Sequence, residues 1–257
     1  MPFPLQGPIT RFLHRRSIAR WRKATASVGA IDLATLDQKN ESAKKLLRHI
    51  QAFRFAAESR LALPPIGSNI FPQPPGTDWA WRPKPWRAAA DTVGLVPALS
   101  KMQITNELVI FHDCPRAEVS LRQVRNTHDT DLAPFGITLE TFHFTGSYLS
   151  LVIEIPKGSC EGLRKRHLIR LAALIERERP TTIYARLNVK NGPNTEQVLL
   201  SLPDDTPETM IEFDLAYSGL NEQRAERMWI DLMIERPAMN KLTIRDLTLC
   251  RYPRAEI

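Results

Sequence analysis

From about residue 101 to the C-terminus, apolar and polar residues alternate in short runs that are separated by turn-forming residues. The clearest of these runs lie at residues 119–121, 149–155, 183–189, 211–215 and 230–234. A period of two places successive side chains on opposite faces of a β-strand. About nine such strands, joined by turns that contain Pro, Gly and Asn, predict a mainly β protein. We expect residues 98–257 to form an antiparallel β-sandwich of the jelly-roll type.

Three features of this region are less regular. The apolar residues change phase between Leu139 and Phe142, and again between Ile244 and Leu247. A β-bulge at each place would restore the alternation. Residues 163–178 fit either a helix or a strand, and we favour a strand from Leu168.

The N-terminal quarter differs in both charge and periodicity. The net charge of the chain is +7, but residues 1–60 carry 12 Lys and Arg against 4 Asp and Glu, so the remainder is close to neutral. Helical apolar spacing predicts helices over 8–25 and 35–62, the second starting in a capping box at Thr35. We expect residues 1–62 to form a basic helical arm for docking or oligomerisation.

The first predicted helix is more basic than a simple contact with its own domain requires, which favours docking on an acidic surface. The candidate docking residues are Arg11, Arg15, Arg16, Arg20 and Trp21. The alternative is a solvated helix that packs its apolar side on the same chain. The apolar face of the second helix must also be covered, either by the sandwich or by a second subunit.

Residues 63–97 are rich in Pro and Trp and are predicted to form an extended connector that wraps over the sandwich. Proline has no N–H to donate, so this segment does not suit a central strand. Its three tryptophans are Trp79, Trp81 and Trp86. They either plug the end of the sandwich core or form an exposed platform on which the apolar faces of sugars stack.

The sequence contains none of the common catalytic or cofactor motifs: GxSxG, HExxH, GxxxxGK[ST], GxGxxG or CxxC. The six His are widely spaced, so we expect no metal site and no cofactor. His112-Asp113-Cys114 precedes Pro115 and is interpreted as a turn at the end of a strand. We expect that the protein is not an enzyme.

A glycosidase carboxylate pair is a competing hypothesis, because sandwich enzymes place such residues on neighbouring strands. The candidates are Asp214, Asp231 and Asp246. Each lies at an alternating position, which favours exposure to solvent or an ion pair with an arginine. The arginines considered as partners are Arg186, Arg224 and Arg245.

Several distinctive segments follow one another along the chain. They are 61–65 (LALPP), 77–83 (TDWAWRP), 111–115 (FHDCP), 132–136 (LAPFG), 186–195 (RLNVKNGPNT), 229–232 (WIDL), 245–247 (RDL) and 251–257 (RYPRAEI). Together they resemble an uncharacterised family of alphaproteobacterial proteins over nearly the whole length. The chain is also similar to the head-spike base proteins of bacterial gene transfer agents, which are phage-like particles.

The second resemblance implies a structural component of a virion-type particle, attached at capsid vertices by the N-terminal arm and carrying a receptor-binding fibre. The implied partners are the capsid protein and the spike fibre protein. A five-fold vertex implies a homo-oligomer of five copies with head-to-tail contacts. The alternative is a carbohydrate-binding jelly-roll module whose polysaccharide partner lies at the bacterial capsule or cell surface.

Three Cys are too few and too scattered to predict a disulfide framework, so we expect synthesis in a reducing cytoplasm before incorporation into a particle. No apolar run is long enough to predict a membrane-spanning helix. We do not expect a nucleic-acid partner, because the near-neutral sandwich lacks an extended basic face.

Overall fold

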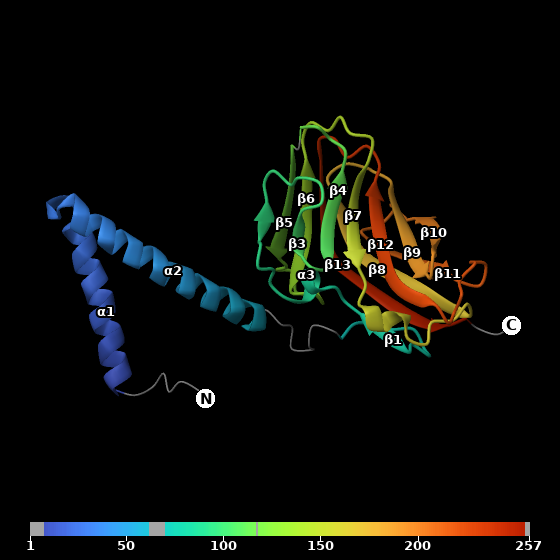
Figure 1. Ribbon diagram of the computed structural model, residues 1–257, viewed down its shortest axis with the longest axis horizontal. Helices are drawn as coiled ribbons and strands as arrows, with labels where there is room; N and C mark the ends of the chain where they lie inside the picture. The colour runs from blue at the N-terminus through green and yellow to red at the C-terminus, as the bar shows by residue number, and fades with distance from the viewer. Residues whose placement is uncertain (1–7, 62–69, 117, 255–257) are drawn as a thin grey trace. The chain divides into compact units, whose positions relative to one another are not determined.

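The computed structural model describes residues 8–61, 70–116 and 118–254 (Figure 1). The chain divides into two compact units, Met1–Phe55 and Ala56–Ile257. The predicted boundary between arm and connector, at residues 62 and 63, lies outside the described residues. The predicted division at residue 97 stays a prediction.

The N-terminal unit contains helix α1 (Pro8–Ala26), a 3-10 turn η1 (Val28–Ala30) and the first part of helix α2 (Leu33–Leu61). Both predicted helices are therefore present. The start of α2 differs from the prediction, because Asp32 rather than Thr35 caps it. The Asp32 carboxylate accepts a 2.9 Å hydrogen bond from the Thr35 N–H, which lowers the pKa of Asp32.

Antiparallel strands form two sheets in the second unit, and we call them sheet A and sheet B. Sheet A has the order β11-β8-β13-β6-β5-β2, and β1 pairs separately with β13. Its strands are β1 (Trp79–Trp81), β2 (Gly94–Leu95), β5 (Val119–Arg125), β6 (Phe135–Thr141), β8 (His167–Arg177), β11 (Glu208–Asp214) and β13 (Asn240–Pro253).

Sheet B has the order β10-β9-β12-β7-β4-β3 (Figure 1). Its strands are β3 (Gln103–Thr105), β4 (Leu108–His112), β7 (Leu149–Glu154), β9 (Ile183–Asn191), β10 (Asn194–Ser201) and β12 (Ala225–Ile234). Two short helical turns, α3 (Lys84–Arg87) and η2 (Lys157–Cys160), complete the unit. The mainly β, jelly-roll-type sandwich predicted from the alternation is confirmed.

The core lies between the two sheets and consists of the apolar members of the alternating runs. Ile137, Leu171 and Leu249 from sheet A, and Leu151 and Ile230 from sheet B, are almost completely buried. A sheet with one covered face requires this alternation. The polar members therefore cover the outer faces, where a binding site can form.

The structure settles the irregular regions individually. Residues 163–178 include β8, so the strand interpretation is confirmed. The register of β13 against β8 shifts between Ile244 and Asp246, as expected for a bulge. The other expected bulge is wrong: β6 ends at Thr141, so Phe142 lies beyond the strand.

Candidate functional site

The three connector tryptophans are placed mainly in the core. Trp86 is completely buried, and its Nε1–H donates a 2.8 Å hydrogen bond to the carbonyl oxygen of Ile244. Trp81 is 9% exposed and stacks on the half-buried Trp79, with 6.2 Å between ring centroids. Trp81 and Trp86 thus lie in the core, as in the first alternative, whereas Trp79 packs against the core and is half-buried. Burial of a large aromatic ring removes a large apolar area from water, which favours this placement.

The predicted docking residues lie along α1. Arg15, Arg16 and Arg20 are exposed, and Trp21 is half-buried. The Arg20 guanidinium lies 5.8 Å from the centroid of the Trp21 ring. The side chain of Arg11 lies outside the described ones.

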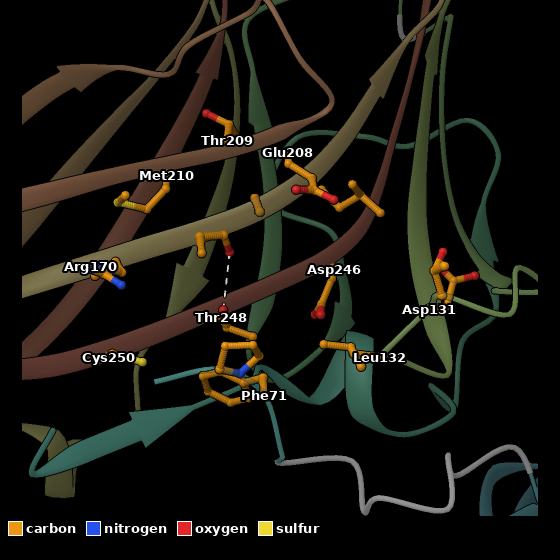
Figure 2. Close-up of a pocket in the computed structure, with 15 residues that line it drawn as sticks. Phe71, Asp131, Leu132, Arg170, Glu208, Thr209, Met210, Asp246, Thr248 and Cys250 are labelled. Carbon is orange, nitrogen blue, oxygen red and sulfur yellow. Dashed lines mark hydrogen bonds between the residues drawn. The ribbon is translucent and has the colours of Figure 1, made fainter. Parts of the chain in front are cut away.

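Sheet A carries a hollow of about 480 Å³ on its outer face (Figure 2). Ala172 and Thr248 line it together with Phe71, Leu132 and Met210. Three of its charged side chains already form ion pairs. These pairs are Asp246 with Arg82, Asp131 with Arg245, and Arg170 with Glu212. The hollow therefore offers few charged groups for a ligand.

A larger groove of about 1130 Å³ crosses the outer face of sheet B. Residues from β3, β4, β7, β12 and β9 line it. The strand register arranges the lining side chains in rows across the sheet. The rows are Phe111–Ser150–Met233–Tyr184, Val109–Val152–Asp231–Arg186 and Glu154–Trp229; the buried Asn188, which does not line the groove, is paired with Trp229 on β9.

A charged pair occupies the middle row. Both Nε and Nη2 of Arg186 donate to Asp231 Oδ2, at 2.9 and 2.6 Å. Asn188 Nδ2 donates to the same oxygen at 3.0 Å. Asp231 is buried and Arg186 is half-buried, so the guanidinium is the more accessible member. The Asp231 carboxylate is thus held in one position, and Arg186 faces the groove.

Aromatic rings lie in the rows on either side of this pair. Trp229, Tyr184 and Phe111 are half-buried, so part of each ring contacts solvent. The Arg227 guanidinium lies 5.0 Å from the Trp229 ring centroid, and its Nε donates to Glu154 at 3.0 Å. Rings held in this way present fixed apolar surfaces beside hydrogen-bonding groups.

The His112-Asp113-Cys114 turn supports one end of the groove. Asp113 Oδ1 accepts hydrogen bonds from the amide N–H of Ser147, at 2.8 Å, and of Tyr148, at 3.2 Å. Ser147 and Tyr148 line the groove. The Ser147 hydroxyl also donates to Asp113, and with the amide donors it lowers the pKa of Asp113 to about 2.

The candidate glycosidase carboxylates do not converge on one site. Asp214 and Asp246 belong to sheet A and Asp231 to sheet B. Asp231 pairs with Arg186, one of the three arginines considered, at 2.6 Å. The partners of the other two differ from those considered: Asp214 pairs with Arg254 at 3.1 Å, and Asp246 with Arg82 at 2.8 Å.

Within the residues that the structure describes, no three or more His, Cys, Asp and Glu side chains are grouped so that they could hold a metal ion. None of the helices in the described ranges has the length and apolarity needed to cross a membrane.

Sequence reasoning did not select Trp229, Tyr184 or Phe111 as ligand-binding candidates. The sequence did contain a pattern that could have identified two of them. Trp229 and Tyr184 occupy outward positions of predicted strands, and most of the other outward positions there carry polar residues. A large aromatic residue at a solvent-facing strand position often marks a binding surface. Only the strand order, however, brings these rings together.

The sequence model of a family of unknown function, DUF6478, matches residues 1–257. The chain belongs to this family. A comparison with curated proteins finds no match for this DUF6478 member.

Solved structures resemble part of the DUF6478 chain. The enzymatically active domain of tailspike protein 4 from bacteriophage CBA120 is 8% identical with a TM-score of 0.41, and the match covers 56% of this chain and 19% of the tailspike chain. The family 11 carbohydrate-binding module from Clostridium thermocellum, in complex with a β-1,3-1,4-mixed-linked tetrasaccharide, is 15% identical with a TM-score of 0.39. That match covers 62% of this chain and 96% of the module. These likenesses concern the fold alone.

Proposed function

We propose that the sandwich binds an uncharged polysaccharide along the groove of sheet B. The observation that carries this proposal is the position of Trp229 on one side of the Asp231–Arg186 pair and of Tyr184 and Phe111 on the other. Sugar rings have apolar faces that pack on aromatic rings, and their hydroxyls bond to fixed polar groups.

The charges in the groove favour a neutral ligand. Its basic residues Lys101, Arg186 and Arg227 are balanced by three acidic residues, Glu154, Asp231 and Glu235. Arg186 pairs with Asp231, and Arg227 with Glu154. Neighbouring strands are about 4.8 Å apart, so the five lining strands span roughly 20 Å, enough for several sugar units. The proposed activity is binding without hydrolysis.

The test is a glycan array that includes neutral β-linked oligosaccharides and bacterial capsular polysaccharides, probed with the full chain. We expect binding, and we expect Trp229→Ala and Tyr184→Ala to weaken it by about tenfold or more, in the range typical of an anchoring aromatic residue. Tyr217→Ala is the matched control, because Tyr217 is highly exposed and does not line the groove.

Thermal unfolding of each variant checks that its fold is retained. Absence of glycan binding, or equal loss in the Tyr217→Ala control, contradicts the proposal.

We propose, as a second function, that α1 attaches the chain to the capsid of a phage-like particle, with the sandwich at the base of a receptor-binding fibre. The resemblance to head-spike base proteins motivates this role. The supporting observation is that α1 has no Asp or Glu and exposes Arg15, Arg16 and Arg20. An unbalanced cationic helix is attracted to an acidic surface.

Co-sedimentation with particles tests the docking role. We expect the triple variant Arg15→Glu/Arg16→Glu/Arg20→Glu to release the chain from particles. The control carries the same charge change on exposed residues of the sandwich, namely Arg116→Glu/Lys157→Glu/Arg164→Glu. If the α1 variant stays bound, or if both variants are released, α1 is not the docking element.

A further inference from the structure

We propose that α2 pairs with α2 of a second copy of this chain, in antiparallel orientation, through a heptad-spaced apolar stripe. We define the α2 stripe as Leu33, Leu36, Asn40, Ala43, Leu47 and Ile50. This inference does not rest on the proposed functions, and its test uses neither glycans nor particles. A two-fold pair differs from the five-copy ring that the resemblance to head-spike base proteins implies.

The spacing of the stripe is that of a coiled coil. Leu33, Asn40 and Leu47 lie seven residues apart, and Leu36, Ala43 and Ile50 form a second series offset by three. In the heptad notation these are the a and d positions, which face a partner helix. In the sequence, the next a position is Arg54, so the apolar series is interrupted there before Ala57 and Leu61. The series from Leu33 to Ile50 covers about two and a half heptads of the 29-residue helix, so the dimer is argued from exposure and charge as well as from spacing.

The stripe is largely uncovered in a single copy. Leu33 is 83% exposed, Leu47 52% and Ile50 46%. Phe53, beside the stripe, is 70% exposed. An apolar face of this extent is unfavourable in water and marks an interaction surface.

The α1 helix lies beside the stripe from Leu33 to Ala43. Trp21 and Ala24 of α1 line a groove of about 590 Å³ together with Leu36 and Ala43 of α2. Leu36 and Ala43 are accordingly half-buried, whereas Leu47 and Ile50 are exposed. The α1 helix therefore leaves the C-terminal end of the stripe, at Leu47 and Ile50, available to another helix.

The flanking charges disfavour a parallel pair. In parallel coiled coils a g residue faces the e residue five positions further along the second copy. This arrangement would place Asp32 beside Asp37 and Lys39 beside Lys44. Both contacts join like charges, which oppose association.

In an antiparallel pair the flanking residues of the two copies carry opposite charges. With Leu36 opposite Leu47 of the second copy, Leu33 lies opposite Ile50, and Asn40 lies opposite Ala43. Asp37 then lies beside Lys44 of the second copy, and the two-fold axis forms this ion pair twice. Asn40 adds selectivity, because a polar residue in an otherwise apolar seam restricts register and oligomeric state. Charge complementarity and apolar register therefore select the same arrangement.

Sedimentation velocity of the full chain over a concentration series tests the association. We expect a concentration-dependent dimer, and we expect Leu47→Asp to raise its dissociation constant by about tenfold or more, because the variant places a charge in the seam. Lys45→Asp is the matched control on the opposite face of α2 and leaves the dimer intact. Circular dichroism confirms that both variants keep their helices.

Charge exchange tests the orientation. Asp37→Lys and Lys44→Asp each weaken the dimer, because each variant places like charges side by side. The double variant restores opposite charges and recovers the association. In a parallel pair each single variant would instead strengthen the dimer, because Asp37→Lys would face Asp32 and Lys44→Asp would face Lys39.

Cross-linking gives an independent readout of the register. Chains carrying Leu33→Cys are mixed with chains carrying Ile50→Cys and oxidised; the native Cys114, Cys160 and Cys250 are buried. We expect a disulfide between unlike chains. Cross-links between two Leu33→Cys chains, a monomer throughout the micromolar range, or a ring of five copies would each overturn the proposal.

Discussion

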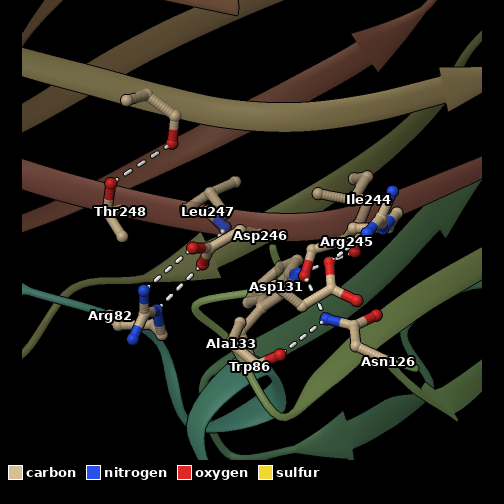
Figure 3. Close-up of polar contacts among 11 residues, drawn as sticks. Arg82, Trp86, Asn126, Asp131, Ala133, Ile244, Arg245, Asp246, Leu247 and Thr248 are labelled. Atoms are coloured by element: carbon tan, nitrogen blue, oxygen red, sulfur yellow. Dashed lines mark hydrogen bonds and ion pairs between the residues drawn. The ribbon is translucent and has the colours of Figure 1, made fainter. Parts of the chain in front are cut away.

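Arg82 Nε and Nη2 each donate a 2.8 Å hydrogen bond to the carboxylate of Asp246, across 164 residues of sequence (Figure 3). Arg82 is completely buried, and its guanidinium lies 5.1 Å from the centroid of the Phe71 ring. The contact joins the connector to β13 in sheet A. The connector is thus held to the sandwich by a bidentate ion pair as well as by its tryptophans.

Replacing this arginine should destabilise the sandwich strongly. Arg82→Met leaves Asp246 without its bidentate partner, and we expect the free energy of unfolding to fall by about 2–4 kcal/mol. Urea denaturation measures the change. Arg227→Met, which removes the exposed pair with Glu154, should cost less than about 1 kcal/mol. Equal losses in the two variants would contradict the structural role assigned to Arg82.

Replacing the core residue Trp86 should lower the free energy of unfolding more than replacing the groove residue Trp229. Trp86→Ala removes a completely buried ring and its hydrogen bond to Ile244, so we expect a loss of about 3–5 kcal/mol. Trp229→Ala removes a ring that is partly in contact with solvent, and should cost about half of that or less. A large loss at Trp229 with none at Trp86 would mean that the core and the groove had been assigned the wrong way round.

Asp113 should make the end of the groove sensitive to acid. Its pKa is lowered from 3.8 to about 2 by the hydrogen bonds from Ser147 and Tyr148. A carboxylate with a lowered folded-state pKa stabilises the fold above its unfolded pKa, and this contribution is lost as the pH falls from about 4 to 2. We expect Asp113→Asn to remove that part of the pH dependence, measured as melting temperature against pH. If the melting temperatures of Asp113→Asn and of the unchanged protein depended on pH in the same way between pH 4 and 2, these hydrogen bonds would not form.

Gly136 is expected to tolerate no side chain. A Cβ there would lie 3.0 Å from Asn126 Oδ1 and 3.0 Å from the carbonyl oxygen of Ile244. The Asn126 amide is not free to move, because Nδ2 donates at 2.8 Å to the carbonyl oxygens of both Ala133 and Arg245 (Figure 3). We expect Gly136→Ala to lower the free energy of unfolding by about 1–3 kcal/mol.

Gly158→Ala is the control for this steric argument, since no atom lies within 4 Å of the Cβ that it would add. Urea denaturation of both variants measures the difference. A neutral Gly136→Ala would show that β6 can move away from β13 at this point.

Local patterns account for the two long helices and for most of the longer strands. The period of two at residues 183–189 and 230–234 predicted β9 and β12, and helical spacing predicted α1 and α2. Strand β10 and the shorter strands β1 to β4 were not among the predicted runs, because each is short or lacks a clear alternation of apolar and polar residues. The end of β6 was placed too far along the chain because Phe142 is apolar, although its side chain is exposed.

The sequence by itself determined which residues can share one face of a strand or helix, since this depends only on the local repeat of the backbone. It therefore specified a sandwich, a basic helix and a stripe along α2. Only the tertiary structure decided that Trp229 and Tyr184 line one groove, or that Arg82 meets Asp246. Those contacts depend on strand order and register, which arise from packing between residues far apart in the chain and not from any local periodicity.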